Sequence, residues 1–266
     1  MRLLHTHTLR LESFDDDRQS PEYAILSHTW GEKEITFEDM RAAHLADLPP
    51  SPSLQKIEQC CSRARTDGFD YVWIDTCCID KSSSAELSEA INSMFRWYQH
   101  SSVCYAYLQD FELPEMPSSS QVLDEETKPK FRNSRWFHRA WTLQELIAPW
   151  SVQFYDANWR WIGSRNEDLL SEICETTSIS RDADSGRCRR HFGFDNLSSV
   201  LDTFAVSTRL SWAARRESTR VEDQAYSLLG LFNINMPLLY GEGVRAFTRL
   251  QRTIVQESRD QSILLW

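Results

Sequence analysis

Short apolar runs alternate with longer amphipathic segments in the first part of the chain, and this alternation is the strongest constraint on the fold. The runs at 23–26, 71–74, 103–108 and 152–155 have the length of buried strands. Between them, apolar residues recur at helical spacing, so helices are expected to join the strands. Because such crossovers are right-handed and pack on the sheet, the pattern predicts an α/β fold with a mostly parallel sheet flanked by helices.

The other segments are assigned from polarity, proline and capping signals. One largely buried helix is expected at 134–148, after a long polar loop at 109–133 and a short first strand around 9–14. We predict two units, a sheet-based core at 1–156 and a mainly α-helical extension at 157–266 packed on it. The extension is expected to hold helices at 169–176, 197–206, 219–230 and 244–257 and a loop at 182–190.

Polar side chains directly follow two of the predicted strands. Ser27, His28 and Trp30 come after the first apolar run, and Asp75 and Asp80 come after the second. The carboxyl ends of parallel strands meet at one edge of the sheet, and ligands of open parallel sheets bind outside that edge. These five residues are therefore predicted to line one rim.

The third predicted strand leads to the same edge. It ends at Gln109 and Asp110, which we expect to join the rim. The polar loop that follows them is in a position to close over a pocket as a lid.

The helix expected at 134–148 places a carboxylate beside a tryptophan. An apolar stripe that includes Trp136 and Leu143 covers most of the helix surface. Glu145 lies one turn after Trp141 on the flank of this stripe, with His138 near it. Two interpretations stay open. Glu145 is either a solvated or arginine-paired helix residue, or a carboxylate at the rim of a pocket with an indole as a stacking platform.

Composition and charge exclude several classes of function. A formal net charge of −10 argues against nucleic acid as the main partner, because phosphate binding needs a broad cationic face. The seven cysteines include two adjacent pairs, which do not fit a disulfide framework and indicate a reducing, intracellular setting. No stretch approaches the roughly 20 apolar residues that span a bilayer, so no membrane association is expected. The apolar end at 263–266 suggests either a piece of a longer protein or a short natural chain.

The common catalytic and metal motifs are missing from the sequence. There is no G-x-x-x-x-G-K-[ST], G-x-G-x-x-G, H-E-x-x-H or G-x-S-x-G, and the His and Cys residues show no paired metal-ligand spacing. No metal and no cofactor are expected.

Two clusters allow a functional and a structural interpretation each. Cys77 or Cys78 with His28 would suit a cysteine-dependent hydrolase, although adjacent cysteines after a buried strand are more often simply packed. Arg215 and Arg220, with acidic neighbours, would suit a phosphate clamp or a surface network of salt bridges around a helix start.

Three blocks of sequence resemble the motifs of the fungal heterokaryon incompatibility (HET) domain. They are YAILSHTWG at 23–31, YVWIDTCCIDK at 71–81 and SRWFHRAWTLQELIAP at 134–149, and the stretch at 220–243 resembles the segment that usually follows. The resemblance implies a cytoplasmic effector of fungal nonself recognition whose activation leads to regulated cell death. It also implies self-association and an NLR-like or other fungal receptor as partner.

A more distant similarity links the chain to TIR domains. The first strand ends in Ser27, the second ends in Asp75, and the signature W-x-x-x-E-L runs from Trp141 to Leu146. This similarity implies a TIR-like, flavodoxin-like sheet. In TIR enzymes the glutamate of the signature cleaves the nicotinamide–ribose bond of NAD⁺, which assigns that role to Glu145. The loop at 109–133 and the extension depart from the TIR pattern.

Together these resemblances imply an NAD⁺ glycohydrolase with NAD⁺ as substrate. Trp141 or Trp30 would stack on a ring of the substrate, and Arg215 or Arg220 would meet its pyrophosphate. The rim residues named above would line the site. The alternative, from another class, is a non-catalytic module that signals by homotypic assembly, in which Glu145 is structural.

Overall fold

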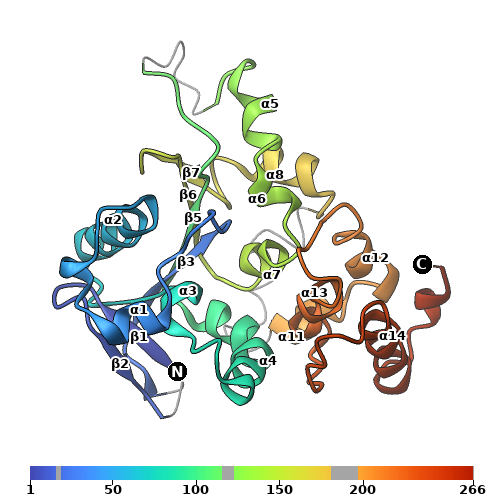
Figure 1. Ribbon diagram of the computed structural model, residues 1–266. Helices are drawn as coiled ribbons and strands as arrows, with labels where there is room; N and C mark the ends of the chain where they lie inside the picture. Colours follow the sequence, from blue (N-terminus) through green and yellow to red (C-terminus); the bar gives the residue numbers. More distant parts are fainter. Residues whose placement is uncertain (16–18, 116–122, 181–196, 266) are drawn as a thin grey trace.

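A seven-stranded sheet forms the centre of the protein, whose computed structural model describes residues 1–15, 19–115, 123–180 and 197–265 (Figure 1). The strand order is β2-β1-β4-β3-β5-β6-β7. The four inner strands are parallel to one another, whereas β1, β2 and β7 are antiparallel to their neighbours. The strands are β1 (Arg2–His5), β2 (Leu11–Ser13), β3 (Tyr23–His28), β4 (Tyr71–Trp73), β5 (Val103–Tyr107), β6 (Val152–Tyr155) and β7 (Trp161–Ser164).

The predicted mostly parallel sheet flanked by helices is confirmed, and its four parallel strands are the four apolar runs of the sequence. Every residue of β3 and β5 is buried, which is why these strands are continuous apolar runs and not alternating ones. β1 was not predicted, since the first strand was expected only around 9–14. The sheet also continues beyond residue 156, because β7 pairs with β6, so the last strand falls within the predicted extension.

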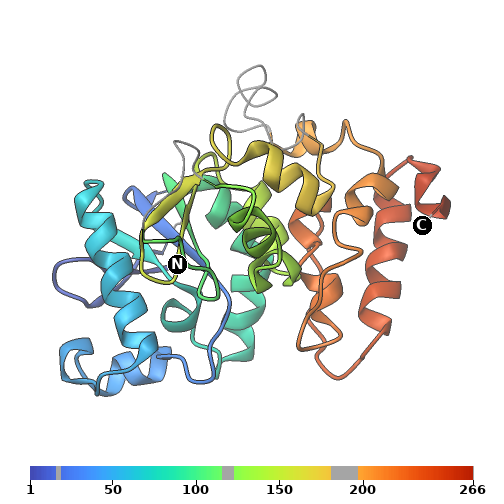
Figure 2. The same ribbon diagram turned by 90° about the horizontal axis from the view of Figure 1, so that it is seen from above.

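Helices cover both faces of the sheet. Figure 2 shows α2 (Pro52–Thr66) on one side and α4 (Ser84–His100) with α7 (Thr142–Ile147) on the other, and the orange to red extension lies beyond them. Ser51 caps α2 by accepting a hydrogen bond from the Leu54 amide, and Gly68 follows its end with a φ of +88° that suits glycine. α2 and α4 lie on opposite faces because both crossovers are right-handed but run in opposite directions along the sheet. The first goes from β3 to β4, and the second goes from β4 back past β3 to β5.

The single helix predicted at 134–148 is wrong, because two shorter helices replace it. α6 (Arg135–His138) ends where Arg139 forms a parallel bridge with Glu217, and α7 starts only at Thr142. The Glu217 amide donates to the His138 carbonyl at 2.6 Å, and its carbonyl accepts from the Ala140 amide at 2.7 Å. The extension thus takes over hydrogen bonds that a continuous helix would make within itself.

The extension packs against α4 through its own short helices. The Asn92 side chain of α4 donates to the Met236 carbonyl at 3.3 Å and accepts from the Met236 amide at 3.2 Å. The described elements are α8 (Leu170–Thr177), α11 (Leu197–Leu201), α12 (Val206–Ser211), α13 (Asp223–Tyr226), η4 (Leu229–Phe232), α14 (Arg245–Glu257) and η5 (Gln261–Leu265).

Two of the extension's predicted helices are shorter than expected. Of the helix predicted at 197–206, α11 forms only the first half, and α12 begins at Val206. Of the one predicted at 219–230, α13 forms the middle, and η4 begins at Leu229. The Glu222 carboxylate does not cap a helix start at 219, because it accepts hydrogen bonds from the Gly241 and Gly243 amides, at 2.8 and 2.9 Å.

The segment predicted as one loop at 109–133 is partly helical. It contains α5 (Thr127–Arg132), and Asp110 accepts hydrogen bonds from the Ser134 hydroxyl at 2.6 Å and the Arg135 amide at 2.8 Å. Positions 116–122 of this segment, and the loop predicted at 182–190, lie outside the described residues. Among the described helices, none has both the length and the apolar character needed to cross a bilayer.

Candidate active site

A cavity of about 310 Å³ lies at the carboxyl ends of β3 and β4, and we call it the Glu145 cavity. Its walls come from both the sheet-based part and the extension. The lining residues are His28, Trp30, Asp75, Ile79, Lys81, Leu87, Ile91, Met94, Arg139, Trp141, Glu145, Thr219, Arg220, Asp223 and Tyr240. The cavity is therefore closed only when the extension packs on α4 and α7.

Glu145 is a buried carboxyl group in this cavity, with only 7% of its surface exposed. The Ser27 hydroxyl donates to its Oε2 at 2.5 Å, and the Trp136 indole Nε1 donates in turn to the Ser27 oxygen at 2.8 Å. Burial raises the pKa of Glu145 to about 7, against the opposing hydrogen bond from Ser27. The group is thus held in one orientation and titrates near neutral pH.

Titration of Glu145 is expected to destabilise the fold as the pH rises. The carboxyl group ionises near pH 4.5 in the unfolded chain and near pH 7 in the folded one. Between these values the folded state binds more protons, so the free energy of unfolding falls with rising pH, by on the order of 3 kcal/mol in total. Glu145→Gln has no ionisable group at this position, so its free energy of unfolding should not fall in this way. Urea unfolding from about pH 4 to about pH 8 should show the variant gaining stability relative to the wild type, and a constant difference would contradict the assignment.

Trp30 forms a half-open wall of the cavity, with 40% of its surface exposed. Its indole Nε1 donates to Asp75 Oδ2 at 2.8 Å, which fixes the plane of the ring. Lys81 Nζ lies 3.7 Å from the centre of that ring, and Arg139 Cζ lies 5.3 Å from it. The rim therefore combines an aromatic face with two cations.

His28 is buried behind this wall and stays neutral. Its Nε2 is 3.8 Å from Asp75 Oδ1, and among the described residues neither ring nitrogen has a hydrogen-bond partner. Burial lowers the pKa of the imidazole well below its ordinary value, and the charge of Lys56 lowers it further. A neutral imidazole next to a cavity is available to donate or accept a hydrogen bond from a ligand.

The extension supplies the opposite wall. The Tyr240 hydroxyl donates to Asp223 Oδ1 at 2.9 Å, and Arg220 Cζ lies 4.5 Å from the centre of the Tyr240 ring. Burial raises the pKa of Asp223, while the hydrogen bonds from Tyr240 and Trp141 oppose that shift. Arg220 itself is exposed at the mouth of the cavity, where a charged part of a ligand would enter.

The model of the heterokaryon incompatibility protein family (HET) matches residues 23–129, which include β3, β4 and β5. The chain is also 43% identical, over 237 residues, to vegetative incompatibility protein HET-E-1 of Podospora anserina. The chain belongs to the HET family. The aligned region covers 88% of this chain but only 16% of that relative, so the chain spans a small part of the relative's length. No solved structure matches the chain significantly.

In this HET chain, six of the predicted site residues line the Glu145 cavity, and Ser27 contacts Glu145 from behind it. Asp80 does not line the cavity, and its carboxylate accepts a hydrogen bond from the Ser82 amide at 3.0 Å. Arg215 does not line it either and is exposed. The six residues are His28, Trp30, Asp75, Trp141, Glu145 and Arg220.

Several side chains of the HET cavity were missed in the sequence. Lys81 ends the second motif block, so its place after a strand was a usable signal. Arg139 lies between α6 and α7, at a helix break that was not predicted, and Asp223 lies on α13 of the extension. Gln109 lines a different cavity, and His138, expected near Glu145, is exposed.

The buried cysteines of this HET chain do not suit a nucleophile. Cys77 and Cys78 are buried on α3 (Asp75–Cys78), and neither lines the Glu145 cavity. A hydrogen bond with Cys78, together with burial, raises the pKa of the Cys77 thiol well above its ordinary value. A thiol that resists ionisation is a poor nucleophile, so the packed interpretation is favoured.

Proposed function

We propose that this chain is an effector domain of fungal nonself recognition that hydrolyses NAD⁺ at the nicotinamide–ribose bond. The observation that carries the proposal is a buried, oriented glutamate, Glu145, in a cavity with an aromatic wall and a cationic rim. Membership of the HET family supports the role in incompatibility. We further propose that the protein acts in the cytoplasm, self-associates, responds to an NLR-like or other receptor, and triggers cell death.

The reaction needs a fixed negative charge beside the ribose. As the bond between C1′ and the pyridinium nitrogen breaks, nicotinamide leaves with the bonding electrons and the ribose develops positive charge. Ionised Glu145 would stabilise that charge, water would add at C1′, and its proton would be released. Because the pKa of Glu145 is raised to about 7, the ionised fraction grows through neutral pH.

The remaining side chains suit the other parts of a dinucleotide. Trp30 or Trp141 offers an indole for stacking on a ring. Lys81, Arg139 and Arg220 give the rim its positive charge, which suits a pyrophosphate. Arg215, which is exposed away from the cavity, has no part in this proposal.

The test is chromatography of NAD⁺ incubated with concentrated purified protein, with and without a crowding agent that favours assembly. We expect nicotinamide and an ADP-ribose product to accumulate in proportion to protein and time. No nicotinamide under either condition would contradict the proposal and favour a non-catalytic module that signals by homotypic assembly.

A further inference from the structure

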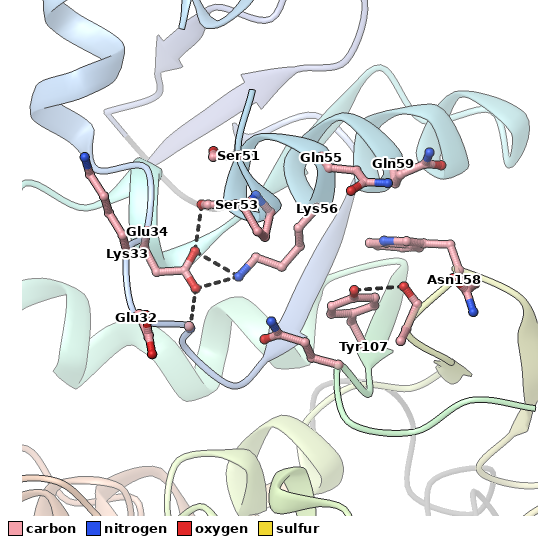
Figure 3. A pocket seen from close by; sticks show the side chains of 15 residues that line it. Glu32, Lys33, Glu34, Ser51, Ser53, Gln55, Lys56, Gln59, Tyr107 and Asn158 are labelled. Carbon is pink, nitrogen blue, oxygen red and sulfur yellow. Dashed lines mark hydrogen bonds and ion pairs between the residues drawn. The ribbon is translucent and has the colours of Figure 1, made fainter. Parts of the chain in front are cut away.

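A second and larger cavity, of about 530 Å³, lies at the carboxyl ends of β3 and β5 (Figure 3). It shares no lining residue with the Glu145 cavity. The chain leaves β3 towards β4 on one side and later returns to β5 on the other, so this cavity is at the point where the strand order reverses. Crevices at such points are the preferred ligand sites of open parallel sheets. The volume is also within the usual range for small-molecule sites.

An aromatic pair forms one wall of this second cavity. The rings of Tyr107 and Trp159 are stacked, with centres 5.0 Å apart and planes 21° apart. Trp159 has a φ of +58° in the turn between β6 and β7, where glycine or asparagine would fit without strain. A bulky indole in a left-handed conformation is costly, and such strain is typical of ligand sites.

Side-chain amides line the rest of the cavity. Gln55 and Gln59 are one turn apart on α2 and, in Figure 3, lie on the α2 side of the cavity. Gln109 and Asn158 come from the ends of β5 and β6. Within the described part of the chain, Gln109 Oε1 is buried without a hydrogen-bond partner. Each amide offers a donor and an acceptor together, which matches the alternating edge of a nucleobase.

The charges in this cavity are already balanced. Lys56 Nζ is 2.7 and 2.8 Å from the two carboxylate oxygens of Glu34, which also accept from the Ser53 hydroxyl at 2.8 Å and the Gly31 amide at 2.7 Å. The other pair of charged lining residues, Glu32 and Lys33, has no net charge. A neutral ligand therefore suits the cavity better than a phosphate.

We propose that this second cavity binds the adenine base of a nucleoside. The base would stack against the pair of Tyr107 and Trp159, and the Gln59 amide would pair with its exocyclic amino group and ring nitrogen, as glutamine does with adenine in nucleic acids. The proposal does not depend on cleavage of NAD⁺ at Glu145.

The test is calorimetric titration of adenosine into the purified chain. Trp159→Gly removes the indole but keeps the left-handed turn, so it should fold and bind adenosine at least about tenfold more weakly. Gln59→Leu, on the helix, should weaken binding by a similar factor. Trp161→Ala is the matched control, because this indole is 48% exposed on β7 and lines neither cavity. Its affinity should equal that of the wild type.

Three results would overturn the proposal. The first is that the wild type shows no saturable binding of adenosine. The second is that Trp159→Gly and Gln59→Leu bind adenosine with the affinity of the wild type. The third is that inorganic phosphate displaces adenosine. Glu145→Gln should bind adenosine as the wild type does, since the two cavities share no residue. In that variant, displacement of adenosine by NAD⁺ would identify the adenosine half of the dinucleotide as the ligand, and lack of displacement would assign the site to a free nucleoside.

Discussion

Glu145→Gln is expected to lower the rate of nicotinamide release from NAD⁺ by about 100-fold or more, because it removes the preorganised charge that the proposed reaction requires. Glutamine keeps the size of the side chain, and its amide oxygen still accepts from the Ser27 hydroxyl. The loss should therefore appear in kcat, measured by chromatography of the released nicotinamide, while the fold is retained.

The control for this variant is Glu172→Gln. Glu172 is also a buried carboxylate, but it pairs with Arg132 and lines neither cavity. Its replacement should leave the rate close to that of the wild type. Nicotinamide release by Glu145→Gln at the wild-type rate would show that Glu145 is structural. Urea unfolding of the Gln variant at neutral pH checks that it is folded, so that a loss of activity can be assigned to the missing carboxylate.

Arg165→Met is expected to lower the free energy of unfolding by about 3 kcal/mol or more. The guanidinium of Arg165 is buried and donates to the carbonyl oxygens of Leu146, Pro149 and Trp150. Methionine fills most of the space of the arginine stem but leaves these carbonyls without their charged donor. Since Leu146 is next to Glu145, the variant should also displace α7 and reduce any activity of the cavity.

Arg135→Met provides the comparison for Arg165. The Arg135 side chain is 62% exposed and lies 3.5 Å from Asp110, so its replacement should change stability by only about 0.5 kcal/mol. Urea unfolding of the wild type and the two variants measures both effects. Similar midpoints for Arg165→Met and the wild type would show that water or backbone relaxation replaces the arginine.

The sheet-based part was largely predictable because its signals are local. A strand buried on both faces must be a short, continuous apolar run, and the runs at 23–26 and 103–108 correspond to β3 and β5. Parallel pairing then brings the residues after each strand to one edge, so the sequence already indicated that His28, Trp30 and Asp75 lie together. β1, which lies between β2 and β4, escaped prediction because a strand of only four residues carries little pattern.

The parallel strands, the edge where the cavity lies and the interest of Glu145 could all be predicted from the amino-acid sequence. Three features could be seen only in the folded chain. Glu217 divides the helix at Arg139, Asp223 and Tyr240 close the cavity, and burial raises the pKa of Glu145 to about 7. The physical reason is the range of the interactions. Periodicity records which face of a segment is buried, but a bridge between residues far apart in the chain, and the loss of solvent around a carboxylate, depend on the packing of several segments at once.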